Sequence, residues 1–449
     1  MLPNTTYPGL GGLSQAVEWL SSLSRFGIRP GLDRTRRVLQ EFGSPEAKLR
    51  FYHVAGTNGK GSVCSFLARI LAVNQTVGLF TSPAFDGYRG RFSIQGTTIG
   101  DEEFAQLALK VKETSSHVLF DDPLTEFEAL TIMAILYFAE HKVDAVVWET
   151  GLGGRFDSTN VVIPVVAAIT NVSYDHMEIL GDTIQDIAYN KAGIIKPGVP
   201  VVTAATDEAY LVIQTVAKEQ NSRLYRYPIH FASAPAQSNI NGQRMNYRGV
   251  TRDLFGLSIP LWGRHQYENA AVALAMYEIS CSLHVCARAR DEEILHAIET
   301  VRWPGRFEVI QGGSQPIVLD GAHNADGARK FASALAQFSK QNDLAMDDWT
   351  MVIGVLADKQ VMPILASVLP QAGRVIVTAP RVRRAKPASL LSKDIKIIRS
   401  DLEVREIPSV REALSEAWKL GKPIACWGSL YTVDEARKAI QERPDEFVK

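Results

Sequence analysis

Short, almost entirely apolar runs alternate along the chain with segments of helical periodicity, and this alternation is the strongest constraint on the fold. Strands that are apolar throughout are typical of parallel sheets covered by helices on both faces. The sequence therefore predicts an α/β protein. After the first apolar run, 50–55, five apolar residues have the i, i+3, i+4, i+7, i+8 spacing of one helical face: Val63, Phe66, Leu67, Ile70 and Leu71. Expected strands are 50–55, 77–82, 144–150, 164–173 and 199–205, and helices are expected near 101–113, with Asp101 as N-cap, and at 124–141.

The same rhythm restarts after residue 310, which divides the chain into two parts. Pro304 and Gly305 break regular elements, so we expect a hinge at 303–305 between a larger part, 1–302, and a smaller one, 306–449. The expected fold is an N-terminal P-loop-type domain with a mostly parallel sheet, followed by a smaller Rossmann-like α/β domain. Strands of the second domain are expected where the segments PIVLD, TMVIG, GRVIV and PIACW begin.

A glycine-rich loop, GTNGKGS at 56–62, follows the first expected strand and precedes the first expected helix. The strict phosphate-loop template, G-x-x-x-x-G-K-[ST], requires Gly at 54 and a hydroxyl at 61, where this chain has Val54 and Gly61. Strand, glycine turn and helix is nevertheless the arrangement in which backbone N–H groups and a helix N-terminus bind phosphate. We interpret the loop as a phosphate site in which Lys60 supplies charge and Ser62 a magnesium ligand. A plain turn between strand and helix is the alternative.

Acidic and imidazole side chains follow three of the expected strands at their carboxyl ends. In open parallel sheets ligands bind at these ends, and magnesium prefers hard oxygen ligands. Each such residue alone could be a helix cap or a satisfied loop residue, but three strand ends together indicate a site. The residues are Glu149, Asp175 and His176 in the first part and Asp320 and His323 in the second.

Lys191 falls on the apolar face of an expected helix that begins after a cap at Asp182. It continues the spacing of Ile184, Ile187 and Ala188 at i, i+3, i+4 and i+7. A buried ammonium group is costly unless it is paired or neutral. Two interpretations stay open, an inward lysine with a function and a lysine whose stem extends along the helix to solvent.

Composition excludes several classes of function. The 449 residues are 46% apolar and 22% charged with a net charge of −1, so no global field attracts nucleic acid or an anionic membrane. The apolar stretch at 130–139 is too short to cross a bilayer and is expected as a core helix. The basic run at 381–387 is expected as a solvated loop, with an anion site as the alternative.

No secretory signal is visible at the N-terminus, and no C-x-x-C pair occurs. These features indicate a cytoplasmic protein with thiols packed as small apolar side chains. The cysteines are scattered: Cys64, Cys281, Cys286 and Cys426.

Ten segments together resemble the folylpolyglutamate synthase/dihydrofolate synthase family of the Mur ligase superfamily, particularly its bacterial members. The resemblance runs nearly end to end and in the family's order: HVAGTNGKGSV, TSP, TEFEALT, ETGLGGRFDSTN, DHMEILGDTI, KAGIIKPG, HQYENAAVALA, WPGRFE, LDGAHN and GSLYTV. In that family Gly follows the loop lysine and the hydroxyl comes one place later, as here. The resemblance implies a ligase that uses ATP to add L-glutamate to reduced folates, and also to dihydropteroate, through an acyl phosphate.

The resemblance also implies the residues that handle ATP and metal. Those that bind ATP would be Gly56, Thr57, Asn58, Gly59, Lys60, Gly61 and Ser62, with Asn269, Arg306 and Asp320. The catalytic set would be Lys60, Lys191, Asp320 and His323. One magnesium ion would lie on Ser62, Glu149 and His176, and Lys191, carboxylated by CO2, would help to hold a second. A monovalent cation is a further candidate.

The implied partners are a reduced folate or dihydropteroate, L-glutamate and ATP, with no nucleic acid and no membrane, and the chain would be a monomer. The pterin pocket would be lined by Arg29, Pro30, Gly31, Ser82, Thr125, Glu126, Phe127, Glu128, Phe156, Asp157 and Ser158.

One loop departs from the family pattern. Where relatives often have SPHL followed by Glu-Arg, this chain reads TSPAFDGYRGRF, with Ala84 in place of His and Gly90 before Arg91. The change concerns folate binding rather than the ATP chemistry. Two alternatives remain, another amino-acid ligase of the superfamily and a nucleotide-binding regulatory protein that no longer ligates. Only 55 residues precede the glycine loop, which argues against a ligase with a separate nucleotide-sugar domain there.

Overall fold

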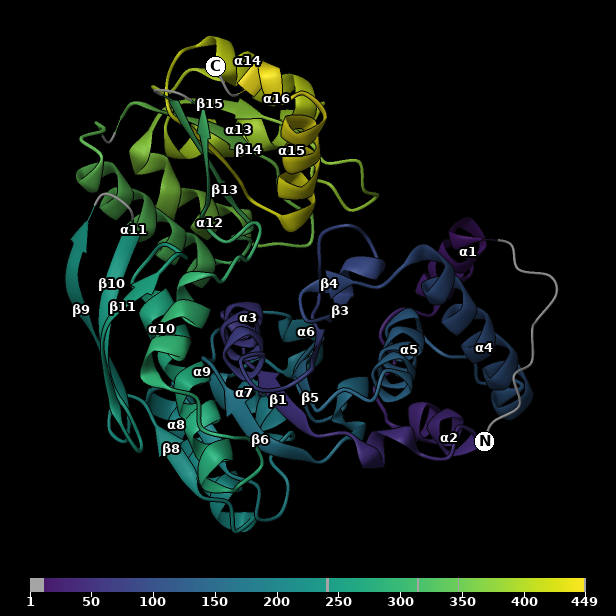
Figure 1. Cartoon of the computed structure of the whole chain (residues 1–449). Coiled ribbons are helices and arrows are strands. Elements are labelled where there is room, and N and C mark those ends of the chain that lie inside the picture. The colour runs from purple at the N-terminus through teal and green to yellow at the C-terminus, as the bar shows by residue number, and fades with distance from the viewer. Residues whose placement is uncertain (1–11, 240–241, 313–314, 346, 448–449) are drawn as a thin grey trace. The chain divides into compact units, whose positions relative to one another are not determined.

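The computed structural model describes residues 12–239, 242–312, 315–345 and 347–447, which group into two compact units (Figure 1). Neither unit is one continuous segment. Unit 1 takes the described residues of Met1–Ala232, Tyr247–Leu254 and Asn269–Ala297, and unit 2 those of Ser233–Asn246, Phe255–Glu268 and Ile298–Lys449. The expected division at 1–302, 303–305 and 306–449 stays a prediction.

Unit 1 is built on an eight-stranded sheet. Its strands are β1 (Phe51–Ala55), β2 (Val77–Phe80), β3 (Phe92–Ile94), β4 (Thr97–Thr98), β5 (Ala145–Glu149), β6 (Pro164–Ile169), β7 (Val201–Thr203) and β8 (Leu224–Arg226), in the order β4-β3-β2-β5-β1-β6-β7-β8. From β2 to β8 neighbouring strands are parallel, and β3 and β4 are added antiparallel at one edge. Every residue of β1 and of β5 is buried, as expected for strands that are apolar throughout.

Helices connect the strands of unit 1. They are α1 (Leu13–Leu23), α2 (Asp33–Glu41), α3 (Lys60–Leu71), α4 (Asp101–Leu119), α5 (Glu126–Glu140), α6 (Met177–Leu180), α7 (Ile184–Ala192) and α8 (Asp207–Glu219). Figure 1 shows α1, α2, α4 and α5 together beside the sheet. The expected core helix at 130–139 is confirmed, because α5 is buried without interruption from Glu128 to Phe138.

Two expected helix caps are wrong by one residue. Asp101 is the first residue of α4, and Gly100 occupies the N-cap. Asp182 does not cap α7, because the Thr183 side chain accepts the N–H of Asp186 instead. A threonine oxygen at the N-cap satisfies the same exposed donor that an aspartate would.

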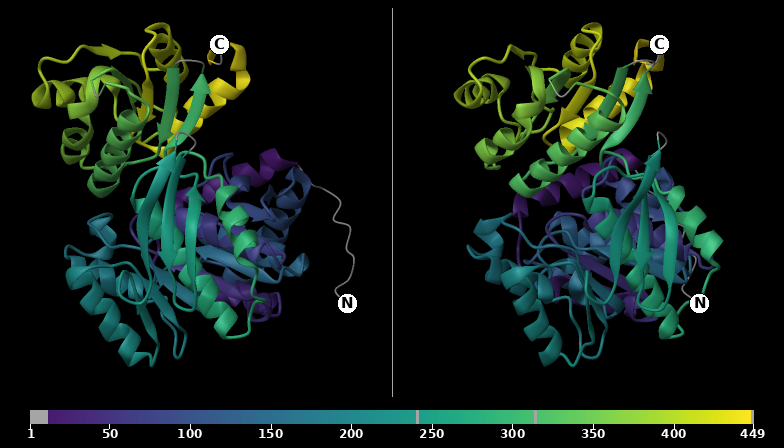
Figure 2. Two further views of the ribbon diagram at one scale, coloured as in Figure 1. Left: turned by 60° about the vertical axis from the view of Figure 1, so that its left-hand side comes forward. Right: turned by 90° about the vertical axis from the view of Figure 1, so that its left-hand side faces the viewer.

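Unit 2 contains a six-stranded sheet of order β12-β13-β17-β14-β15-β16. Its strands are β12 (Glu308–Gly312), β13 (Gln315–Asp320), β14 (Trp349–Ile353), β15 (Ala372–Val377), β16 (Val404–Glu406) and β17 (Ile424–Trp427). All neighbours are parallel except β12, which pairs antiparallel with β13. Its helices, green to yellow in Figure 2, flank these strands: α11 (Ala325–Gln341), α12 (Val361–Val368), α13 (Ala388–Ile398), α14 (Val410–Lys419), α15 (Leu430–Glu442) and α16 (Pro444–Phe447).

A three-stranded sheet of order β11-β10-β9 was not expected from the sequence. Its strands are β9 (Ala232–Asn239), β10 (Gly242–Arg248) and β11 (Asp253–Ile259). Two helices follow these strands in the chain, α9 (His265–Ser282) and α10 (Asp291–Glu299). The residues of β9 and β10 are largely small or polar, so they lack the continuous apolar pattern that marks the parallel strands.

The expected fold class is confirmed, with a mostly parallel sheet in each unit. The basic run at 381–387 forms a loop before α13. From this loop, Lys386 forms an ion pair with Asp394 of α13 at 2.5 Å, and Arg384 forms one with Asp358 at 3.6 Å. No helix in the described part of the chain combines the length and the apolarity that crossing a membrane requires.

Candidate active site

The glycine loop joins β1 to α3 and is fixed in place by the end of β6. The N–H of Thr57 donates to the Asn171 carbonyl, and the N–H of Asn58 donates to the Asn171 side-chain oxygen, both at 2.8 Å. The Thr170 hydroxyl returns a hydrogen bond to the Asn58 carbonyl at 2.7 Å. Thr170 and Asn171 thus hold the backbone of the glycine loop in this conformation through hydrogen bonds within the protein.

Two glycines of the loop leave no room for a side chain. Gly56 has φ +151°, and a Cβ atom there would overlap the hydroxyl of Thr170. Gly59 has φ +88°, caps α3, and a Cβ atom would lie 2.5 Å from Oδ1 of Asn269. Only glycine fits both the backbone angle and the space. The contact also brings Asn269, an expected ATP-binding residue, against the loop.

Two lysines point at one carbonyl oxygen of the loop. Lys60 Nζ donates to the Gly56 carbonyl at 3.1 Å, and Lys191 Nζ donates to the same oxygen at 3.0 Å. Lys191 is 3% exposed, so it lies inward and its stem does not extend to solvent. Burial, and next the charge of Lys60, lower the pKa of Lys191 to about 7 against the opposing attraction of Asp175 and Asp157.

The carboxyl ends of three neighbouring strands meet beside the loop. β1 pairs with β5 through Val54 and Glu149 and with β6 through Ala55 and Ile169. The residues after these strands therefore share one edge of the sheet. Glu149 is buried there, and its Oε2 accepts the N–H of Ser82 at 3.0 Å.

Ser62 and His176 belong to the helices that follow these strands. Ser62 is buried in the first turn of α3. His176 is the N-cap of α6, in a left-handed backbone conformation with φ +50°, and its side chain is 39% exposed. Its Nε2 lies 3.8 Å from Oδ1 of Asp175. Within the described residues, no group of three or more His, Cys, Asp and Glu side chains is placed to hold a metal ion by itself.

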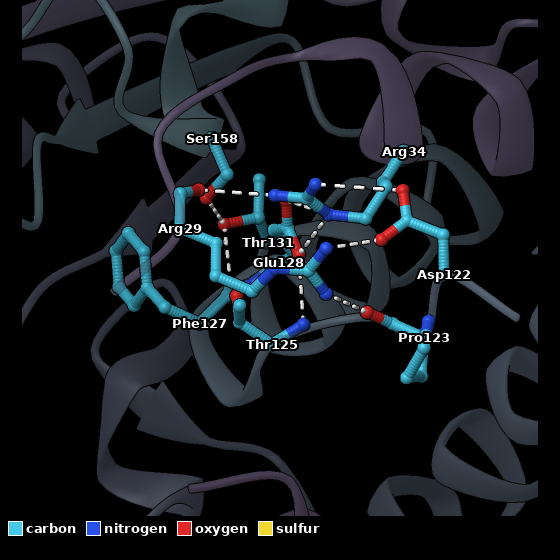
Figure 3. A network of polar contacts seen from close by, with 9 residues as sticks. All are labelled: Arg29, Arg34, Asp122, Pro123, Thr125, Phe127, Glu128, Thr131 and Ser158. Atoms are coloured by element: carbon cyan, nitrogen blue, oxygen red, sulfur yellow. Dashed lines mark hydrogen bonds and ion pairs between the residues drawn. The ribbon is translucent and has the colours of Figure 1, made fainter. Parts of the chain in front are cut away.

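A polar network connects the expected pterin-side residues (Figure 3). Thr125 and Glu128 form a capping box at the N-terminus of α5. Oε2 of Glu128 accepts the N–H of Thr125 at 2.7 Å, and the Thr125 hydroxyl accepts the N–H of Glu128. The same carboxylate accepts Arg34 Nε at 3.0 Å, and Arg34 donates to the Arg29 carbonyl at 3.0 Å. Arg29 in turn pairs with Asp122.

A second glycine-rich loop, GLGGRFDSTN at 151–160, is fixed by Asp157. Its side chain accepts the N–H groups of Leu152, at 2.7 Å, and Thr159, at 3.0 Å, and burial raises its pKa. The Ser158 and Thr131 hydroxyls are 2.7 Å apart. The remaining expected lining residues are more accessible: Pro30, Gly31 and Glu126 are half-buried or exposed, Phe127 is half-buried and packs beside Phe80, and Phe156 is 53% exposed.

Three expected site residues belong to unit 2: Arg306 precedes β12, Asp320 ends β13, and His323 follows that strand. Asp320 accepts the N–H groups of Phe307 and Ala322, both at 2.8 Å. Burial raises the pKa of Asp320 to about 6, while the positive charge of Arg306 opposes that rise. His323 Nδ1 lies 2.8 Å from the Gly321 carbonyl, and because a carbonyl only accepts, Nδ1 carries the hydrogen.

The sequence-based site lacked four residues on which its geometry depends. Thr170 and Asn171 fix the glycine loop, and Arg34 and Asp122 hold the Glu128 network. Asn171 lies near the carboxyl end of the expected strand 164–173, and that position was the one available signal. Arg34 lies in a run with three arginines, and nothing in that run distinguishes the one that reaches Glu128.

Comparison with known proteins matches both parts of the chain to one family. Residues 54–277 match the Mur ligase middle domain, and residues 305–426 match the Mur ligase, glutamate ligase domain. The dihydrofolate synthase/folylpolyglutamate synthase of Bacillus subtilis is 40% identical over 328 residues, which are 72% of this chain and 76% of that protein. The chain belongs to the folylpolyglutamate synthase/dihydrofolate synthase family of Mur ligases. It is an ATP-dependent glutamate ligase with folylpolyglutamate synthase/dihydrofolate synthase activity.

Solved structures of this family match nearly the whole chain. The folylpolyglutamate synthase of Mycobacterium tuberculosis, complexed with ADP and AMPPCP, has a TM-score of 0.87 at 28% identity and covers 95% of this chain and 98% of its own. The bifunctional folylpolyglutamate synthase/dihydrofolate synthase of Yersinia pestis, complexed with AMPPNP and a Mn ion, has a TM-score of 0.83 at 28% identity, with 98% and 100% covered.

Proposed function

We propose that this ligase accepts both dihydropteroate and reduced folates and activates their carboxylates as acyl phosphates. The substrate carboxylate attacks the γ-phosphorus of ATP, the bond to the β–γ bridging oxygen breaks, and ADP leaves. The amine of L-glutamate then attacks the acyl carbon, and phosphate leaves as the amide forms. Catalysis in such a reaction is mainly positioning and charge stabilisation.

The observation that carries this proposal is the pair of lysines on the Gly56 carbonyl. Lys60 begins α3, where a helix N-terminus and glycine N–H groups already attract an anion. Its ammonium group would exchange the Gly56 carbonyl for a terminal phosphate when ATP binds. Arg306, Asp320 and His323 remain predicted contributors from unit 2.

Lys191 has the properties of a lysine that reacts with CO2. A carbamate forms when a neutral amine attacks the carbon of CO2, an N–C bond forms and a proton leaves. Burial and Lys60 together keep the pKa of Lys191 near 7, so much of its amine is neutral at neutral pH. Carboxylation would replace a cation with an anion beside Lys60, which removes a repulsion and creates an attraction.

The residues fit magnesium bound together with nucleotide rather than magnesium held by protein alone. Magnesium is usually bound through one or two carboxylates plus substrate phosphates. Glu149 is a buried carboxylate at the shared sheet edge, and Ser62 and His176 follow the neighbouring strands. When bound, the ion offsets the negative charge that develops on the phosphates. A second ion would need the Lys191 carbamate.

The proposal is tested by ADP release with ATP, L-glutamate and either dihydropteroate or a reduced folate such as tetrahydrofolate. We expect release that requires L-glutamate and occurs with each acceptor in turn. Release with only one acceptor would restrict the activity to that substrate. Release that ignores both acceptors would contradict the folate assignment and favour another amino-acid ligase of the superfamily.

A mass measurement tests the carbamate separately. Native mass spectrometry in bicarbonate buffer should show one added CO2, about 44 Da, which is lost in CO2-free buffer and never appears in Lys191→Met. A short carboxylic acid should partly restore turnover to Lys191→Ala. An unmodified amine at Lys191 under CO2-replete conditions would count against the carbamate.

A further inference from the structure

Two cysteines distant from the glycine loop in sequence lie side by side in unit 1. Cys281 is in the last turn of α9, and Cys286 is in the segment that follows it. Their sulfur atoms are 3.0 Å apart. The four cysteines are expected to pack as separate small apolar side chains, but this contact brings two of them together.

The end of α9 creates this contact. His284 has φ +58°, and the N–H of Val285 donates to the Ser280 carbonyl at 3.0 Å while the N–H of His284 donates to the Cys281 carbonyl. This pattern reverses the chain directly after the helix. The reversal returns Cys286 to the helix, where its sulfur also lies 3.0 Å from the Ser280 hydroxyl. The turn at the end of α9 therefore holds the two sulfur atoms in contact.

Solvent reaches this pair, unlike the other two thiols. Cys281 and Cys286 are half-buried, whereas Cys64 and Cys426 are fully buried. A cavity of about 120 Å³ adjoins Cys281 and is lined by Arg252, Tyr277, Glu278 and Arg288 among others. Such a space admits a molecule the size of hydrogen peroxide.

The surroundings also favour a thiolate at Cys281. The sulfur–sulfur contact with Cys286, with smaller contributions from Tyr277, Arg252 and Arg288, lowers the pKa of Cys281 to about 7 against the opposing effect of burial. The same contact raises the pKa of Cys286. Burial raises the pKa of Cys64 and Cys426. One member of the pair is thus the nucleophile and the other stays a thiol.

We propose that Cys281 and Cys286 form a reversible dithiol/disulfide site that is oxidised by hydroperoxides. The Cys281 thiolate attacks one peroxide oxygen, the O–O bond breaks, and the hydroxide that leaves is protonated to water. The sulfur of Cys286 then attacks the sulfur of the Cys281 sulfenic acid, and the S–O bond breaks. The departing hydroxide takes the thiol proton as water, so two thiols lose two electrons and peroxide becomes two waters.

Little movement is needed to form the bond. A disulfide requires sulfurs about 2.05 Å apart, so the pair has to close by roughly 1 Å. The two residues are separated by only four others, and the turn that links them is already closed. In reducing compartments disulfides of this kind are transient and serve as redox sensors. The site is at the far end of the helix that carries Asn269, and it is independent of the proposed ligase chemistry.

The test uses the full chain, hydrogen peroxide and peptide mass mapping. No Lys or Arg lies between Arg264 and Arg288, so one tryptic peptide contains both cysteines. One to five equivalents of peroxide should reduce the mass of that peptide by about 2 Da, and dithiothreitol should restore it. A wild-type peptide that keeps two alkylatable thiols under these conditions would overturn the proposal.

Single variants separate the two roles. Cys286→Ser should stop at a sulfenic acid on Cys281, about 16 Da heavier and trapped by dimedone. In Cys281→Ser, the other thiol of the pair, Cys286, should be oxidised at least about tenfold more slowly than the wild-type pair. Cys64→Ala and Cys426→Ala are the matched controls and should oxidise at the wild-type rate. Equal reactivity of Cys281→Ser and Cys286→Ser, or oxidation that depends on Cys64 or Cys426, would contradict the assignment.

Discussion

Two ammonium groups that donate to one carbonyl oxygen form an arrangement whose charges repel. Lys60 and Lys191 share the Gly56 carbonyl, and Lys191 is fully enclosed by protein. The repulsion is relieved if one amine is neutral or modified, or if a polyanion lies between the two lysines. Each of these conditions can be examined by changing a single residue.

Removing the Lys60 charge should chiefly affect turnover. We expect Lys60→Ala to lower turnover by about 10²–10³, because it removes one donor that stabilises charge on the transferred phosphate. Initial rates of ADP release measure this effect. Lys218→Ala, at an exposed position of α8, is the matched control and should retain the wild-type rate. Turnover of Lys60→Ala within threefold of wild type would remove Lys60 from the catalytic set.

Lys191 should make stability depend on pH in CO2-free buffer. Its pKa in the folded chain is about 7, below the ordinary 10.5, so between these values the unfolded chain binds more protons. Stability therefore rises with pH across that window, by at most about 1.4 kcal/mol per pH unit. Urea denaturation of wild type and Lys191→Met at pH 7, 8 and 9 measures the difference. Parallel pH profiles would show that Lys191 titrates normally.

At the scale of elements, the glycine loop depends on close packing between β1 and the end of β6. Gly56→Ala combines an unfavourable backbone angle with an overlap at Thr170, so we expect a loss of about 2–4 kcal/mol. Gly198→Ala also has a positive φ, +73°, but nothing within 4 Å of the added Cβ, and should cost about 1–2 kcal/mol. Chemical denaturation compares the two variants. Equal losses would mean that the loop yields to the added methyl group.

The sequence was sufficient for elements whose own pattern decides their structure. The parallel strands β1, β5 and β6 are almost entirely apolar, with His53 and Glu149 as the exceptions, and their burial follows largely from that pattern. The strands β9 and β10 have no such pattern, because their pairing depends on each other rather than on continuous burial. An antiparallel or edge strand with small and polar residues does not differ locally from a loop.

The site was predictable to the same extent. Glycines, lysines and carboxylates at strand ends indicate phosphate chemistry by their residue type and spacing. Contacts between segments that are distant in the sequence have no such local signal. Arg34 reaches Glu128 across 94 positions, and Thr170 reaches Asn58 across 112. Local periodicity contains no information about such pairs, so the residues that position the site were the ones the sequence left out.

At the scale of the whole molecule, each unit has an apolar core of its own. One core of unit 1 surrounds Trp148 and a second includes Ala167, whereas the core of unit 2 surrounds Trp349 and Trp427. Separate cores allow separate unfolding. A chain of this kind is expected to depart from a single two-state transition.

Hydrogen exchange in increasing denaturant should therefore give different opening free energies for peptides from β1 and β14. AMPPCP at a hundred times its Kd should raise the opening free energy of the unit 1 peptides by about 2.7 kcal/mol, because a ligand that binds only the folded state stabilises it by RT ln(1 + [L]/Kd). Lys60→Ala, at the same nucleotide concentration, should show a smaller rise because its affinity is lower. Exchange of both sets of peptides in one step without nucleotide would contradict independent cores. An unchanged β1 region with nucleotide would contradict phosphate binding at the loop, whatever the behaviour of β14.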